Sequence, residues 1–259
     1  MTSLDKAAAL KARAAAGSAP VSALTAYDYP TARLADEAGV DVILVGDSLG
    51  MVVLGFPDTT HVTMDHMLHH VAAAARGAEK ALLLGDLPIH SYPDPETAVI
   101  NARCLTEAGA EAVKLEGGLR QIEKVQAIVA ADIPVIGHLG MLPQRVKEEG
   151  GYKKKGKTEA QAAELVEASL ALQDAGICAL VLESVVPEVA ARISHQVSVP
   201  TIGIGCGHGH THGEVAVISD VVGSYPWFVP PFAKPRAQVA ASISSAVGEF
   251  IRDITPLDS

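Results

Sequence analysis

Short apolar runs recur along the chain, and stretches with the helical spacing of apolar and polar positions separate them. Three of the runs read alike. Each begins with Ala-Gly, continues in apolar and β-branched residues and ends at a glycine or an acid, over 38–46, 108–116 and 175–183. The glycine stands where a preceding helix, such as 96–107 or 159–174, would end. A run that is apolar on both faces is typical of a strand buried in a parallel sheet.

The same alternation predicts about eight strand–helix units. Further strands are expected over 21–26, 81–85, 133–137 and 200–204, with a weaker eighth near 215–222; further helices are expected over 30–37, 64–76, 120–130, 187–195 and 237–251. About eight such units in about 250 residues are typical of a single (β/α)8 TIM barrel, with a doubly wound open sheet as the alternative. No linker or shift in composition divides the chain. We therefore predict one domain over 1–259, with a short N-terminal helical segment over about 1–20.

Composition narrows the class of function. Of the 259 residues 49% are hydrophobic, and 30 acidic against 20 basic residues give a formal net charge of −10. This balance argues against a nucleic-acid partner, which calls for a basic patch, although a metal could still hold an anionic metabolite. No apolar stretch of about 18 uncharged residues occurs, so we expect no membrane span. Three cysteines without CxxC spacing favour a reducing, cytoplasmic location.

Charged side chains stand where the predicted strands end. In chain order they are Asp47, Asp86, Glu116, His138 and Glu183. A lone acid at such a place is usually a helix cap, but four on separate strands of a barrel are expected to gather at one mouth. Crowded carboxylates need a cation or a shared proton, and oxygen ligands suit Mg²⁺, which takes only one or two protein carboxylates. Lys114 shares a strand face with Glu116 and would neutralise acids or hold a substrate carboxylate.

Two motifs compete with this reading. Residues 151–158 match G-x4-G-K-T, but 146–150 do not form the buried strand that a phosphate-binding loop must follow. We interpret this segment as a mobile basic lid over the barrel mouth. His208, His210 and His212 alternate in a glycine-rich loop, where we expect them to face solvent rather than a metal.

Several blocks resemble the ketopantoate hydroxymethyltransferase family, in order from about residue 20 to about residue 233. They are Thr25-Ala26-Tyr27-Asp28, Val45-Gly46-Asp47-Ser48-Leu49-Gly50-Met51, Val113-Lys114-Leu115-Glu116-Gly117-Gly118, Gly137-His138-Leu139-Gly140 with Pro143-Gln144, Leu182-Glu183 and Ile202-Gly203-Ile204-Gly205. The resemblance implies a barrel of the phosphoenolpyruvate mutase/isocitrate lyase type. It implies transfer of a hydroxymethyl group from 5,10-methylenetetrahydrofolate to 3-methyl-2-oxobutanoate, which gives ketopantoate on the route to pantothenate and coenzyme A.

The resemblance also assigns roles to residues. Asp47 and Asp86 would be the metal carboxylates for Mg²⁺, with Glu116 supporting the metal through water. Ser48 and Lys114, together with Asp47 and Asp86, would hold the 2-oxo acid, and Glu183 would be the general base. The family further implies a homo-oligomer, commonly a decamer.

Glu116 and Glu183 each follow a repeat glycine by seven residues, yet different roles are expected of them. Lys114 should keep Glu116 ionised, whereas Val181 in the equivalent place gives Glu183 an apolar setting suited to accepting a proton. His138 is the next candidate for the base.

The chain departs from the family pattern at a few positions. Lys155 stands where the family has Gln, Cys206 replaces Ala, and His212-Gly213-Glu214 replaces Asp-Gly-Gln. These changes leave the acids intact but bear on substrate fit. The alternatives are a Mg²⁺-dependent C–C or P–C bond lyase or mutase acting on another 2-oxo acid, and a non-enzymatic nucleotide binder using 151–158.

Overall fold

A computed structural model describes residues 1–15 and 17–254 of the chain. These residues form two compact units, Met1–Val215 and Ala216–Ser259, of which the second is described as far as residue 254. The prediction of one domain over the whole chain stays a prediction.

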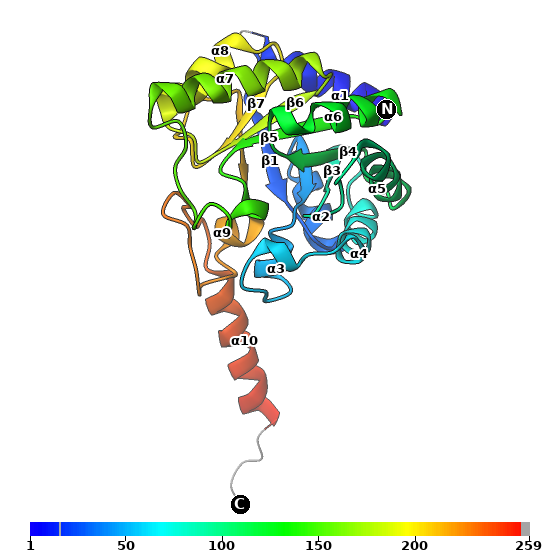
Figure 1. The fold of residues 1–259 in the computed structure, drawn as a ribbon. Coiled ribbons are helices and arrows are strands. Elements are labelled where there is room, and N and C mark those ends of the chain that lie inside the picture. The colour runs from blue at the N-terminus through cyan, green and yellow to red at the C-terminus, as the bar shows by residue number, and fades with distance from the viewer. Residues whose placement is uncertain (16, 255–259) are drawn as a thin grey trace, which may run out of the picture. The chain divides into compact units, whose positions relative to one another are not determined.

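The first unit holds a closed barrel of eight parallel strands that follow one another in chain order (Figure 1). The strands are β1 (Val21–Thr25), β2 (Val42–Val45), β3 (Leu82–Asp86), β4 (Ala112–Glu116), β5 (Val135–Gly140), β6 (Ala179–Glu183), β7 (Thr201–Ile204) and β8 (Gly213–Ala216). The predicted (β/α)8 barrel is therefore confirmed, and the open sheet is excluded.

Helices of the first unit surround the strands (Figure 1). They are α1 (Ser3–Lys11), α2 (Tyr29–Glu37), α3 (Leu49–Val52), α4 (Met64–Ala75), α5 (Pro95–Glu107), α6 (Ile122–Ala130), α7 (Glu159–Asp174) and α8 (Pro187–Gln196), with 3-10 turns at Ala12–Ala14, Thr59–His61, Leu119–Gln121 and Pro143–Arg145. The repeat glycines Gly39, Gly109 and Gly176 follow α2, α5 and α7 with φ of 87°, 114° and 101°, as expected of a helix C-terminus.

The eighth strand lies earlier in the chain than predicted. The apolar stretch near 215–222 is divided between β8 and the short helix α9 (Ile218–Val222). β8 begins at Gly213, which pairs with Ile202 of β7. A side chain at Gly213 would meet the carbonyl oxygen of Val21 on β1 at 2.1 Å. The strand position is therefore set by close approach to β1, which hydrophobicity does not report.

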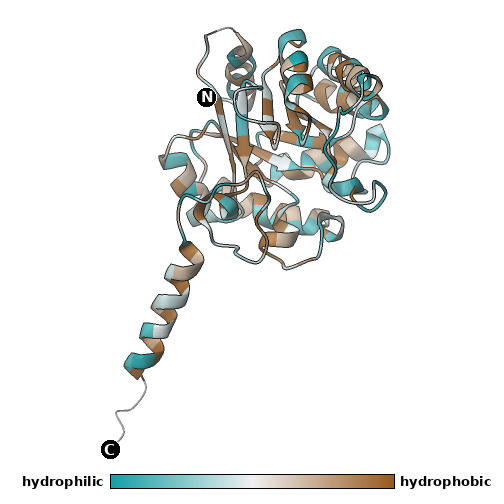
Figure 2. Ribbon diagram, turned by 90° about the vertical axis from the view of Figure 1, so that its left-hand side faces the viewer, coloured by the Kyte–Doolittle hydropathy of each residue, from teal (hydrophilic) through white to brown (hydrophobic). Residues whose placement is uncertain are grey.

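The barrel interior is apolar at the amino ends of the strands and charged at their carboxyl ends. At the amino ends of the strands, apolar side chains such as Val21, Val42 and Leu82 pack in one cluster with Ala7 and Leu10 of α1. The N-terminal helical segment thus closes this end of the barrel. Figure 2 shows hydrophobic strands inside helices that carry hydrophilic positions. The carboxyl ends of the strands hold the charged residues instead.

The second unit contains α9 and the helix α10 (Val239–Ile254). Gly223 follows α9 in the left-handed conformation, and its carbonyl oxygen accepts a hydrogen bond from the Ala240 amide, 3.0 Å away. No residue of α10 is buried. Within 1–15 and 17–254, no helix is both long and apolar enough to cross a bilayer.

Candidate active site

Strand register brings charged side chains together at the carboxyl end of the barrel. Asp86 pairs with Lys114, and Glu116 pairs with His138. Paired residues in parallel strands project to the same face, and so do residues two apart on one strand. Lys114 and Glu116 therefore both face the interior, as predicted from their spacing.

The resulting cluster is a continuous chain of opposite charges. The Lys114 Nζ lies 2.8 Å from Asp86 Oδ2 and 3.9 Å from Glu116 Oε1. His138 lies between two carboxylates, with Nδ1 3.4 Å from Glu116 and Nε2 3.4 Å from Glu183. Asp86, Lys114, Glu116 and His138 are almost fully buried, whereas the Glu183 side chain is 16% exposed. Glu183 thus stands at the edge of the cluster that solvent reaches.

Asp47 joins the cluster through Gln144, whose role the sequence did not reveal. The Gln144 side-chain amide donates to Asp47 Oδ2 at 3.0 Å, and its backbone amide donates to Glu116 Oε2 at 3.1 Å. The hydroxyl of Tyr92 donates a hydrogen bond to the side-chain carbonyl oxygen of Gln144. Gln144 belongs to a 3-10 turn after β5, outside the three Ala-Gly repeats that locate Glu116 and Glu183. Its one sequence signal was its place in the Pro143-Gln144 block.

The pKa directions divide the carboxylates into two kinds. Burial, followed by the charges of Asp86 and Glu116, raises the pKa of Asp47 well above its usual value. Burial also raises the pKa of Asp86, although Lys114 opposes this. Burial acts in the same direction on Glu116, but His138 and Lys114 outweigh it and hold the pKa of Glu116 below its usual value. The predicted ionised state of Glu116 beside Lys114 agrees with this direction.

The two basic groups of the cluster are cationic near neutral pH. Burial alone would lower the pKa of Lys114, but Asp86 and its neighbouring acids raise it. Burial and Lys114 act against protonation of His138, yet Glu116 and Glu183 raise its pKa to about 9. A protonated imidazole cannot accept a proton, so His138 is a poor candidate for the general base.

The surroundings of Glu183 differ from the apolar setting expected from Val181. Its nearest charged neighbour is the His138 imidazole, which β5 supplies from the adjacent strand. The sequence argument compared only residues on the same strand as each acid, so it could not reveal a neighbour from an adjacent strand.

Ser48 follows Asp47 and precedes α3, but its side chain turns to another partner. Its hydroxyl lies 2.9 Å from the hydroxyl of Tyr27. The two residues come from the loops that follow β1 and β2. Ser48 is thus held at the barrel mouth beside the acids rather than within their chain of ion pairs.

The donor set fits a hard cation such as Mg²⁺. Asp86 Oδ1 and Glu116 Oε1 are buried and accept no hydrogen bond within the described residues. Four carboxylates face only two cationic groups, which leaves a formal excess of two negative charges. Among residues 1–15 and 17–254, no three Asp, Glu, His or Cys side chains are arranged to ligate a metal directly.

The competing motifs lie outside the cluster. No strand stands between Gly140 and Gly151, so the G-x4-G-K-T match lacks the strand that a phosphate-binding loop requires. Lys155 instead pairs with Val185 in a single β-bridge. His208 is exposed and lies 2.6 Å from Glu214. The prediction that the histidine-rich loop faces solvent is confirmed for His208.

A closed parallel barrel with ionisable side chains at the carboxyl ends of its strands defines a TIM-barrel enzyme. Solved structures with this fold include a putative phosphonomutase from Burkholderia cenocepacia J2315, with TM-score 0.69 and 15% identity over 95% of this chain and 99% of that one. Another is 2,3-dimethylmalate lyase, a phosphoenolpyruvate mutase/isocitrate lyase superfamily member, with TM-score 0.64 and 20% identity over 98% and 90%. At these identities the likeness shows the predicted barrel type alone.

The sequence comparisons are more specific. The profile of the ketopantoate hydroxymethyltransferase family matches residues 6–257, and the chain belongs to this family. A 3-methyl-2-oxobutanoate hydroxymethyltransferase from Ignicoccus hospitalis is 55% identical over 89% of this chain and 88% of its own length. One from Dehalococcoides mccartyi is 50% identical over 91% and 85%. The chain is thus an enzyme that transfers a hydroxymethyl group to 3-methyl-2-oxobutanoate, with methylenetetrahydrofolate as the co-substrate implied by the family name.

Proposed function

We propose that the acid cluster at the barrel mouth carries out this transfer with Mg²⁺. Asp47 and Asp86 would hold the ion, and Glu116 would support it through water. The buried, unfilled carboxylate oxygens and the excess of negative charge support this assignment. A phosphonopyruvate hydrolase of the same fold, at TM-score 0.64, was solved as a complex with oxalate and Mg²⁺. When bound, Mg²⁺ would polarise the 2-oxo acid and make its C3–H bond more acidic.

Lys114 and Ser48 hold the 2-oxo acid in this proposal, with Asp47 and Asp86 beside it. Lys114 stays cationic because three acids raise its pKa, so it can attract the substrate carboxylate. Ser48 offers a hydroxyl that Tyr27 fixes in direction at 2.9 Å. The ion pair of Lys114 with Asp86 and the hydrogen bond of Ser48 with Tyr27 hold both side chains in place, and such pre-organisation favours a defined substrate pose.

Glu183 removes the C3 proton in this proposal. The C3–H electron pair becomes the enolate double bond, and the proton goes to the Glu183 carboxylate. The enolate carbon then bonds to the methylene carbon of the folate, and water supplies the hydroxyl oxygen. The two bonds from that methylene carbon to N5 and N10 break, and each nitrogen takes one proton, one from Glu183 and one from the water, as tetrahydrofolate leaves. His138 is a positioning residue here, because its cationic ring lies 3.4 Å from Glu183 and fixes the carboxylate.

The position of Glu183 carries the proposal, because it is the one carboxylate of the chain of ion pairs that solvent reaches. Glu183→Gln should stop exchange of the C3 proton of 3-methyl-2-oxobutanoate with deuterium oxide, a half-reaction without folate. Proton transfer to a positioned base contributes about 10²–10⁴-fold, and the exchange rate should fall accordingly. Proton NMR measures the exchange.

The matched control is Glu188→Gln on α8, which changes an exposed carboxylate outside the cluster. Its exchange rate should equal that of the unmodified enzyme. Undiminished exchange in Glu183→Gln would exclude Glu183 as the base.

We also propose that the enzyme is a cytoplasmic homo-oligomer, with a decamer as the family's pattern. The three cysteines are free, which suits a reducing compartment. Five large apolar side chains of α10 are more than half exposed in the single chain, which supports burial against further copies: Ile243, Val247, Phe250, Ile251 and Ile254.

A further inference from the structure

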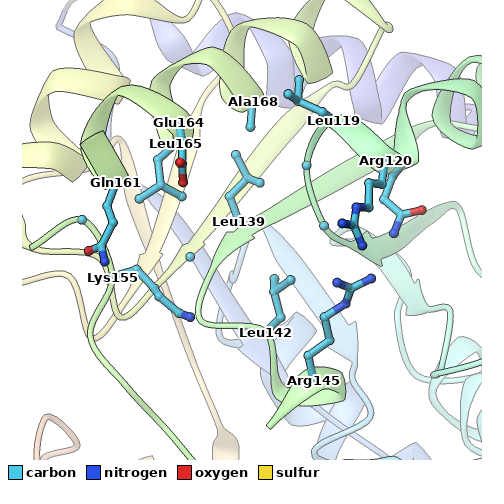
Figure 3. A pocket seen from close by; sticks show the side chains of 15 residues that line it. Leu119, Arg120, Leu139, Leu142, Arg145, Lys155, Gln161, Glu164, Leu165 and Ala168 are labelled. Atoms are coloured by element: carbon cyan, nitrogen blue, oxygen red, sulfur yellow. The ribbon is translucent and has the colours of Figure 1, made fainter. Parts of the chain in front are cut away.

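A cavity of about 500 Å³ lies between the segments that follow β4 and β5, residues 155–156 and the first half of α7 (Figure 3). This volume is within the range of small-molecule sites, about 300–1,000 Å³. None of the side chains assigned to the acid cluster lines it.

The cavity nevertheless borders the acid cluster along three backbone connections. Gly117, which lines the cavity, follows Glu116 directly. Arg145 lines it and follows Gln144, whose backbone amide donates to Glu116. The Lys155 amide donates to the carbonyl oxygen of Ser184 at 2.8 Å, and Ser184 follows Glu183. The cavity therefore lies beside the backbone segments that carry Glu116 and Glu183.

The lining combines apolar side chains, cations and one acid, Glu164 of α7, which lies on the side of the cavity away from the arginines (Figure 3). Leu139, Leu142 and Leu165 form apolar surface, and the guanidinium groups of Arg120 and Arg145 point toward one another at one side (Figure 3). Within the described residues, neither guanidinium has a hydrogen bond or an ion pair. The Lys155 ammonium is instead neutralised by Glu149 at 2.6 Å. Two cations without partners thus face one partly apolar cavity.

We propose that this cavity binds the p-aminobenzoylglutamate part of the reduced folate. The aromatic ring would pack on the leucines, and the two glutamate carboxylates would pair with Arg120 and Arg145. Guanidinium groups match carboxylates in geometry and form charge-assisted hydrogen bonds. The inference rests on the proposed function, which requires a folate whose one-carbon group reaches the substrate beside Glu183.

Electrostatics favours this orientation of the folate over the reverse one. Even with the proposed Mg²⁺ bound, the acid cluster has no formal excess of positive charge that would attract the glutamate carboxylates. The two arginines would hold those carboxylates away from the acids, which leaves the pterin end for the barrel mouth. The arginines would therefore increase affinity for the folate without taking part in bond making.

The test compares two co-substrates: 5,10-methylenetetrahydrofolate and its diamide, in which both glutamate carboxylates are neutral carboxamides. Arg120→Gln and Arg145→Gln should each raise KM for the folate about tenfold, because each removes a charge-assisted hydrogen bond. The value of kcat should change little, since such binding is uniform along the reaction. With the diamide, the unmodified enzyme should already show a KM raised at least about tenfold, and neither substitution should raise it further.

The control is Arg103→Gln on α5, an exposed arginine that does not line the cavity, and KM should stay unchanged. Equal increases in KM for both co-substrates, or no increase for the folate, would overturn the assignment. The C3 proton exchange without folate tests the acids separately. If the arginine variants show normal C3 proton exchange and an unaltered KM for the folate, the folate site alone is refuted. If the unmodified enzyme shows no C3 proton exchange, the proposed role of Glu183 is refuted.

Discussion

The residues of the acid cluster differ in what their neighbours do to their charge. Lys114 and His138 hold Glu116 ionised, while Asp47 has no basic side chain within ion-pair distance in the described residues and donors only from Gln144. The pKa values of Asp47 and Asp86 are both raised, with burial as the largest cause. A bound divalent cation reverses this direction, because it favours the charged carboxylate.

This difference predicts that Mg²⁺ binding releases protons. A raised pKa means that the folded, metal-free enzyme keeps protons on Asp47 and Asp86 above pH 3.8, where unfolded aspartate loses them. Their contribution to stability is present below pH 3.8 and is lost as the pH rises through the raised values. Mg²⁺ affinity should therefore rise with pH through the same range, by up to about one decade per pH unit for each displaced proton. Titration calorimetry in buffers of different ionisation enthalpy counts the protons.

Two substitutions sharpen this measurement. Asp47→Asn should weaken Mg²⁺ binding and reduce the number of protons released, since it removes the acid with the strongly raised pKa. Asp65→Asn on α4 removes an exposed acid outside the cluster and should change neither quantity. Binding without proton release across the acidic range would contradict the prediction.

For individual residues, the sequence predicted side-chain contacts within one strand but not contacts between residues of different strands or loops. The spacing of Lys114 and Glu116 implied a shared face, and the two lie 3.9 Å apart. Gln144 was missed because its contacts with Asp47 and Glu116 span 97 and 28 residues. The pairing of His138 with Glu183 was also missed, because it depends on which strands are neighbours.

Among the elements, the junction of β5 and β6 leaves no room for a side chain at Gly140. Gly140 ends β5 with φ of 100°, in register with Glu183. A side chain there would meet the carbonyl oxygen of Glu183 at 2.2 Å. The Met141 amide donates to the same carbonyl oxygen at 2.8 Å. This glycine thus fixes the backbone that carries Glu183.

We predict that Gly140→Ala destabilises the enzyme and reduces proton exchange. The left-handed conformation costs an alanine about 1–2 kcal/mol, and the steric conflict with backbone adds about 1–3 kcal/mol. Gly39→Ala is the matched control, because Gly39 also has positive φ (87°) but nothing lies within 4 Å of the added carbon. Its loss in the free energy of unfolding should be limited to about 1–2 kcal/mol, with exchange intact. Urea unfolding measures both values, and equal losses would refute the role of close approach.

The bounds of a helix or strand could be predicted from the sequence where its pattern of apolar and polar residues was long enough to be unambiguous. Helix α7 has the predicted bounds, because its periodic pattern ends at Gly176. The short helix α3 was not predicted, since four residues are too few to show a helical period. The sequence predicts a strand that includes Ile218–Val222, which forms α9 instead; a short apolar run does not distinguish strand from helix.

For the molecule as a whole, α10 raises the question of assembly. Its apolar side chains Ile243, Val247, Phe250 and Ile254 follow the helical period and are 51–63% exposed. A helix with one apolar face is stabilised mainly by burying that face. The proposed homo-oligomer supplies a second copy of the chain as the partner that covers it.

The whole-molecule prediction is that Val247→Glu dissociates the oligomer into smaller species. A carboxylate in the middle of the apolar face would be desolvated in an interface without a partner, which is costly. Ala241→Glu is the control, because position 241 lies on the opposite side of the helix and is exposed. Light scattering after size exclusion should give the unmodified enzyme and Ala241→Glu the same mass, a multiple of 26.8 kDa, and Val247→Glu a smaller one. A single-chain mass for all three proteins would refute the proposed assembly, and an unchanged large mass for Val247→Glu would place its interface away from this face of α10.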